Sequence, residues 1–242
     1  MTLGLAYKSP AFTGPVQVTR GTPFQSEYKL VSAFEGMLQD TPEYDGWKVL
    51  REFESVDGIA DVVFFELNQA ADRARCLGGI PPRWAYALRS LPYRKKFSVH
   101  DFAAWTGVTV RHAGQMLGRY HVHGFCEPDV VGNTWVKIQR PQLLSTRIHA
   151  VEAKLRDWRR ALRQAYRYLD YACQSWVLLD ASSVGPAIAH LNEFARLNIG
   201  LASLSTESKI MIHFEPRSSV PRSGMRFWQA NAEIARRLQS GL

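Results

Sequence analysis

The chain has few cysteines and no long apolar run, and each absence excludes a class of protein. Only Cys76, Cys126 and Cys173 occur among 242 residues, and no pair has CxxC spacing. An odd number of widely spaced cysteines argues against a disulfide framework or a zinc knuckle and fits a reducing cytoplasm. No apolar run approaches the roughly 18 residues that a membrane span needs. The N-terminus also lacks a signal-peptide pattern, so we expect a cytoplasmic protein that does not enter a membrane.

The composition favours a folded protein with an acidic partner. Hydrophobic residues make up 46% of the chain, which is enough to build a packed core. Thirty lysines and arginines against 22 aspartates and glutamates give a net charge of +8. Such an excess favours binding to DNA or RNA.

The hydrophobic pattern alternates between the periods of helices and strands, which predicts an α/β core. Residues 1–25, rich in proline and glycine, are expected to form an N-terminal arm. In the strand predicted near residue 50, we expect Trp47, Val49, Arg51 and Phe53 to share one face. The expected elements are helix 26–39, strands 47–54 and 59–65, a strand ending at 154, helix 155–172, strand 176–179, helix 186–197, strands 200–204 and 209–214, and helix 224–238.

Residues 83–140 differ from their surroundings and are expected to form an inserted winged helix-turn-helix. They contain nine lysines and arginines against three acidic residues. A capped helix at 98–105, a turn at Gly107, a second helix from 110 to about 120 and a hairpin give this layout. A protein-docking module is the alternative. The residues expected to contact DNA are Arg111, His112, Gln115 and Arg119 of the second helix, and Lys137 of the hairpin.

Two predicted strands carry charges where apolar residues are expected. Asp61 interrupts the apolar run 59–65, and Glu152 and Lys154 end the strand that begins at Ile148. Side chains two positions apart in a strand point to the same face. A buried carboxylate is costly unless it is paired or bound to a metal. Asp61 could instead cap a turn at the start of its strand.

The helix at 26–39 and the helix after Lys154 add to these charges. Glu27 lies on the apolar face of the first helix, where it could also act as a first-turn acid, and Glu35 is its competitor. The later helix is rich in arginine, and we expect Arg156 and Arg160 to contact phosphates. A solvated helix face is the alternative for these arginines.

The two strand carboxylates form a donor set for Mg²⁺ or Mn²⁺. Asp61 and Glu152 would converge from neighbouring strands as oxygen ligands. A water bound to such an ion is a better nucleophile, and the ion offsets charge on phosphate. Lys154 would orient that water and stabilise the transition state. The pattern therefore predicts metal-dependent hydrolysis of phosphodiester bonds.

The order of these features resembles the PD-(D/E)xK nuclease superfamily, which has a restriction-endonuclease-like core of a mixed sheet flanked by helices. Asp61 matches the family's aspartate although Ala60 replaces the usual proline, and Glu152 and Lys154 match its ExK motif. Gln164 and Tyr168 are similar to the QxxxY motif of RecB-like members, where they would support the site or contact DNA. Under this resemblance residues 26–82 and 141–242 are two parts of one core, with 83–140 inserted between them.

The resemblance implies a Mg²⁺- or Mn²⁺-dependent DNA endonuclease, whose helix-borne acid would be Glu27. With one site per chain, cutting both strands of a duplex would suggest a homodimer. The alternative is a non-catalytic DNA-binding regulator, or a scaffold in a larger nucleoprotein complex, that keeps a nuclease-like fold. RNA is a weaker alternative as the substrate.

Overall fold

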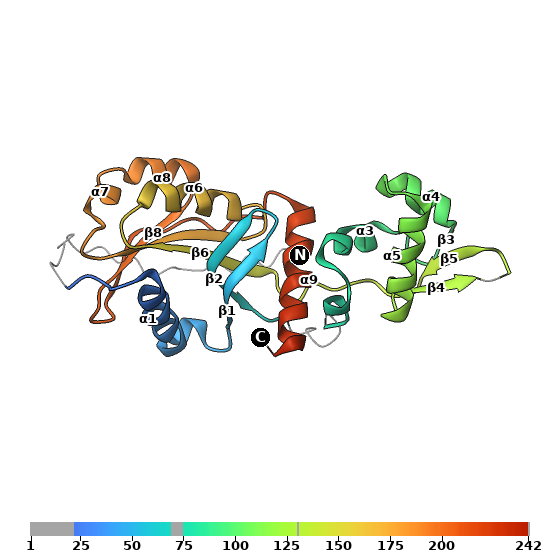
Figure 1. The fold of residues 1–242 in the computed structure, drawn as a ribbon, viewed down its shortest axis with the longest axis horizontal. Helices are drawn as coiled ribbons and strands as arrows, with labels where there is room; N and C mark the ends of the chain where they lie inside the picture. The colour runs from blue at the N-terminus through green and yellow to red at the C-terminus, as the bar shows by residue number, and fades with distance from the viewer. Residues whose placement is uncertain (1–21, 69–74, 130, 242) are drawn as a thin grey trace, which may run out of the picture.

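A mixed six-stranded sheet forms the centre of the larger part of the chain (Figure 1). The structure is a computed structural model that describes residues 22–68, 75–129 and 131–241. The strand order is β1-β2-β6-β7-β8-β9, in which β6, β7 and β8 run parallel to one another and the other neighbours are antiparallel. The strands are β1 Lys48–Ser55, β2 Gly58–Glu66, β6 Arg147–Lys154, β7 Gln174–Asp180, β8 Gly200–Leu204 and β9 Ile210–Phe214. The prediction of an α/β fold is confirmed.

Helices cover both faces of this sheet. On one face lies α1, Glu27–Asp40, which is capped by Ser26 and buries four apolar residues at helical spacing, as predicted: Leu30, Val31, Phe34 and Leu38. On the other face lie α6 Trp158–Tyr168, α7 Gly185–Ile188 and α8 Leu191–Leu197 (Figure 1). Among the described residues, no helix combines the length and apolar character that a transmembrane span requires.

Two predicted helices differ from the observed ones. The helix expected over 155–172 begins only at Trp158, because the Asp157 side chain accepts a hydrogen bond from the Arg160 N–H and caps it there. Tyr166, expected on its apolar face, is 41% exposed. The helix expected over 186–197 is divided into α7 and α8, because His190 between them has a non-helical backbone conformation.

The backbone of β1 changes face at Glu52. This residue has a positive φ of 46°, which side chains other than glycine rarely adopt. As a result Phe53 packs in the same core as Leu50, whereas Val49 packs against the α1 side. The prediction that Phe53 shares a face with Val49 is therefore wrong. The strict alternation on which it rested is interrupted at Glu52.

Between β2 and β6 the chain builds a second, three-stranded sheet of order β3-β5-β4. Ser98 caps α4 with a capping box, Gly107 ends it with a φ of 70°, and Thr109 caps α5. The two helices and the hairpin predicted here are confirmed as elements. In chain order they are α3 Ala85–Ser90, β3 Lys96–Phe97, α4 Val99–Thr106, α5 Val110–Val122, β4 Cys126–Asp129 and β5 Thr134–Lys137.

The last helix, α9 Gly224–Ser240, joins the two parts of the chain (Figure 1). It packs against the short helices η2 Arg75–Gly79 and η3 Pro82–Trp84 and against α3. Its apolar side belongs to the same core as β1 and β2. Most of the predicted N-terminal arm, residues 1–21, lies outside the described residues. Phe24 packs near α1, and its N–H donates to Asp180 at 2.6 Å.

Candidate active site

The candidate site lies where β2 and β6 separate. The antiparallel ladder between them runs from Glu66 and Arg147 to Val62 and Val151. One residue further along, the Asp61 carboxylate accepts the Ala153 N–H at 2.7 Å. A side chain therefore continues the hydrogen bonding where the strand pairing ends, and it holds Asp61 against the end of β6.

The Lys154 ammonium is surrounded by four oxygen atoms. Its Nζ lies 2.9 Å from Glu152 Oε1 and donates to the Ala153 carbonyl oxygen at 2.9 Å. It also lies 3.2 Å from Glu27 Oε2 and 3.7 Å from Asp61 Oδ2. The Glu152 side chain is 1% exposed, whereas that of Glu27 is 46% exposed. The cluster thus has a buried end at Glu152 and an open end at Glu27.

The cluster carries an excess of negative charge. Three carboxylates against one ammonium leave a net charge of −2 when all are ionised. Burial raises the pKa of Glu152, and the nearby Asp61 raises it further; burial likewise raises the pKa of Asp61. Burial lowers the pKa of Lys154, but the carboxylates outweigh it and the net shift is upward. A second cation would relieve this repulsion.

Tyr168 holds the buried end of the cluster. Its hydroxyl oxygen lies 2.6 Å from Glu152 Oε2 and 2.6 Å from the carbonyl oxygen of Ile59. A phenol has one hydrogen, so it donates to one of these acceptors at a time. Burial and the Glu152 carboxylate raise the pKa of Tyr168 well above its usual range. Tyr168 therefore remains a neutral hydroxyl that orients Glu152.

The structure separates the two acidic candidates of α1. Glu27 reaches Lys154, whereas Glu35 accepts a hydrogen bond from Arg51 Nε at 2.7 Å on β1. Gln164 lies one turn before Tyr168 on α6, and its Oε1 is buried without a hydrogen-bond partner among the described residues. The structure thus brings together five of the six predicted catalytic residues, and no hydrogen bond joins Gln164 to the other five.

The donor set of the cluster consists of oxygen atoms alone. Among the described residues, no group of three or more histidine, cysteine, aspartate or glutamate side chains is spaced to hold a metal ion. The four oxygens instead converge on an ammonium, which already occupies a cation position. Carboxylate and carbonyl oxygens are ligands for Mg²⁺ and Mn²⁺ rather than Zn²⁺. Such an ion would reach these oxygens only after the Lys154 ammonium had moved aside.

The predicted DNA contacts on α5 are only partly free. Arg111 and Gln115 are exposed. His112 packs edge-on against Trp84, with ring centroids 5.3 Å apart. Arg119 is exposed, but its Nε donates to the carbonyl oxygen of Gly79 at 2.7 Å.

The prediction that Lys137 contacts DNA is wrong. It is 2% exposed, and its ammonium donates to the carbonyl oxygens of Leu88 and Arg89 at 3.2 and 3.0 Å. These carbonyls lie in the last turn of α3, where the Leu88 carbonyl oxygen also accepts the N–H of the capping residue Leu91 at 3.4 Å. Lys137 therefore stabilises the fold and cannot reach a phosphate. Arg156 and Arg160 are exposed beside the start of α6.

Two backbone groups of the site were not foreseen from the sequence. The Ala153 N–H and the Ile59 carbonyl oxygen position Asp61 and Tyr168, and residue types give no signal for either. Compared with known proteins, the chain matches no family model, no curated protein and no solved structure. Its function has to be argued from the site itself.

Proposed function

We propose that this protein is a Mg²⁺- or Mn²⁺-dependent nuclease that hydrolyses phosphodiester bonds in DNA. The observation that carries the proposal is the convergence of Glu152, Asp61, Glu27 and the Ala153 carbonyl oxygen on one cation position. Such an oxygen cage with excess negative charge is suited to a hard divalent ion.

The order of elements supports the resemblance to the PD-(D/E)xK superfamily. The chain runs α1, β1, β2, β6, α6, β7, with β1, β2 and β6 antiparallel and β7 parallel to β6. Asp61 is on β2, and Glu152 and Lys154 are on β6, as the family's motif requires. The helix pair α4 and α5 followed by the β4–β5 hairpin supports a winged helix-turn-helix inserted between the two catalytic strands.

Each residue of the cluster would have a distinct role in the reaction. Asp61 and Glu152 would hold the ion, with the Ala153 carbonyl oxygen beside them. When bound, the ion supplies a more acidic water and offsets negative charge on the phosphate. Lys154 donates hydrogen bonds to the attacking water and to a phosphate oxygen. Tyr168 fixes the direction of Glu152. Glu27, at the open end, orients the Lys154 ammonium.

One observation favours a second candidate, a non-catalytic DNA-binding protein. Lys154 pairs with Glu152 at 2.9 Å and lies near two further acids, so the cluster is already satisfied as an ion-pair network. A network of this kind can serve to specify the fold. The exposed Arg111 and Gln115 would then carry DNA binding alone.

A cleavage assay separates the two candidates. Plasmid and single-stranded DNA are incubated with the full chain in Mg²⁺, in Mn²⁺ and in EDTA. We expect cleavage that needs the metal, is abolished by Lys154→Ala and Glu152→Gln, and is retained by Glu35→Gln, because Glu35 pairs with Arg51 away from the cluster. DNA that stays intact in every condition, or cleavage that survives both cluster variants, would refute the nuclease. Salt-sensitive binding without cleavage would establish the second candidate.

A further inference from the structure

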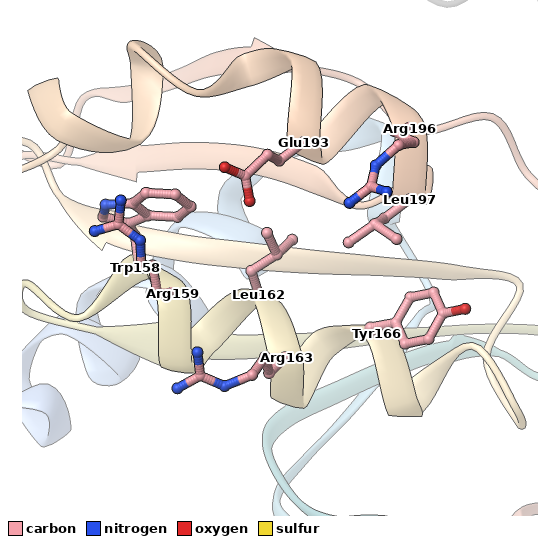
Figure 2. A pocket seen from close by; sticks show the side chains of 8 residues that line it. All are labelled: Trp158, Arg159, Leu162, Arg163, Tyr166, Glu193, Arg196 and Leu197. Atoms are coloured by element: carbon pink, nitrogen blue, oxygen red, sulfur yellow. The ribbon is translucent and has the colours of Figure 1, made fainter.

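A groove of about 290 Å³ lies between α6 and α8, outside the carboxylate cluster (Figure 2). Trp158 and Leu162 of α6 and Leu197 of α8 supply its apolar lining. Arg159 and Arg163 come from α6 and Arg196 from α8, so arginines stand on both sides of it. Trp158 and Leu162 are each 4% exposed, so the groove combines a largely buried apolar floor with guanidinium groups around its edge.

The arginines of the groove are not neutralised by the protein. Arg159, Arg163 and Arg196 are exposed, and none of them forms an ion pair with any residue that the structure describes. Arg159 lies over the Trp158 ring at 4.5 Å. Glu193 is the single acidic residue in the lining. Unpaired guanidinium groups on a groove favour an anionic ligand, and their planar fork matches phosphate oxygens.

An exposed aromatic ring lies at the far end of the groove. Tyr166 is 41% exposed, and the Arg222 guanidinium lies 4.0 Å from its ring centroid. From Arg159 to Tyr166 the groove follows α6 for about 10 Å at 1.5 Å per residue. Aromatic rings beside arginines are the recurring platform for unstacked bases, because every base has a face that can stack.

We propose that the groove between α6 and α8 binds single-stranded nucleic acid. Arg159, Arg163 and Arg196 contact its phosphates, while a base lies against the exposed Tyr166. Charge complementarity identifies the occupant, since a peptide would need several acidic residues to match three arginines.

The position of the groove relates it to the cluster. α6 begins four residues after Lys154, and exposed Arg156 lies between them. A nucleic acid strand bound in the groove would reach the cluster only by passing the start of α6 and Arg156. This role as a substrate path rests on the proposed nuclease function. Binding in the groove does not depend on cleavage and can be measured without it.

The test measures binding in EDTA, where no metal-dependent cleavage occurs. A labelled oligothymidylate and a duplex of equal length are titrated with the full chain at several salt concentrations, and fluorescence anisotropy is recorded. Arg163→Ala combined with Arg196→Ala should weaken binding to the single strand by about tenfold or more. The slope of log affinity against log salt should fall in magnitude by about 1.4, or about 0.7 for each lost phosphate contact.

Matched variants separate the groove from general charge effects. Arg236→Ala removes one positive charge from α9, where Arg236 pairs with Glu233 away from the groove, and should leave binding unchanged. Tyr166→Ala should weaken binding to the single strand by about tenfold, because stacking on one ring is lost. Tyr166→Phe keeps the ring and should bind as the wild type does.

Three results would overturn the inference: wild-type affinity in the double arginine variant, an equal loss in Arg236→Ala, or an equal loss on duplex and single strand. The failure of the nuclease proposal is distinguishable from these. Groove-dependent binding without cleavage in Mg²⁺ would refute the nuclease and support the groove. Metal-dependent cleavage together with binding that is unchanged in the groove variants would support the nuclease proposal and refute binding in the groove.

Discussion

Tyr168 and Tyr171 allow a sharp comparison of two buried hydroxyls. Both rings are fully buried, and their centroids are 6.0 Å apart. The Tyr168 hydroxyl lies 2.6 Å from Glu152 Oε2 and from the Ile59 carbonyl oxygen. The Tyr171 hydroxyl has no hydrogen-bond partner among the described residues. Substitution by phenylalanine removes one oxygen from each position and keeps the ring, so the partners alone differ.

Of the two substitutions, only Tyr168→Phe should lower the stability of the protein. Tyr168→Phe removes a hydrogen bond to a buried carboxylate, and such a bond is worth about 1.5–3 kcal/mol. Tyr171→Phe removes an unsatisfied hydroxyl whose burial costs about 1–3 kcal/mol, so the free energy of unfolding should stay constant or rise. The free energies of unfolding of the two variants should therefore differ by at least about 1.5 kcal/mol, or about 3–6 °C in Tm for a chain of this size.

Urea and thermal unfolding in EDTA measure this difference directly. The Tyr168 hydrogen bond also lowers the pKa of Glu152, so Tyr168→Phe should raise that pKa further and weaken metal binding. Tyr171→Phe should leave metal binding intact. Losses of equal size in both variants would refute the reasoning, because they would show that the contact between Tyr168 and Glu152 contributes nothing.

Three further predictions concern charge. Burial raises the pKa of Glu152, so the folded state holds its proton more tightly than the unfolded state. In EDTA the contribution of Glu152 to the unfolding free energy should fall as pH rises above about 4.5, so the difference between the wild type and Glu152→Gln should decrease with pH; a difference that increases with pH would contradict the shift. Mg²⁺ at about 100 times its Kd should raise the unfolding free energy by about 2.7 kcal/mol, and Asp61→Asn should remove this gain; equal gains would argue against a site at Asp61. Lys137→Met should lower the free energy of unfolding by about 1–3 kcal/mol and leave DNA affinity unchanged. Arg111→Ala should weaken DNA binding and leave the free energy of unfolding unchanged. Urea unfolding and DNA titration of both variants measure the two quantities.

The local pattern of the sequence was sufficient to predict most of the helices and strands near the site. Ser26 and Thr109 cap α1 and α5 as their residue types indicate. The apolar runs that contain Asp61 and end at Lys154 form neighbouring strands. Prediction failed at Phe53, because a positive φ at Glu52 has no signature in a non-glycine residue. It also failed at Tyr166, because helical spacing does not say how far around the helix the core extends.

The sequence by itself determined the order of the elements and the presence of two carboxylates and a lysine on buried strands. Periodicity and capping are local properties, so they can be read from a short stretch of chain. Tertiary structure alone decided which groups meet: Lys154 contacts Glu27 across 127 positions, and Asp61 bonds the Ala153 N–H across 92. Only the tertiary structure also shows that Glu35 pairs with Arg51, that Lys137 is buried, and that a groove lies between α6 and α8. These pairings depend on how the helices pack on the sheet, and no local pattern encodes that packing.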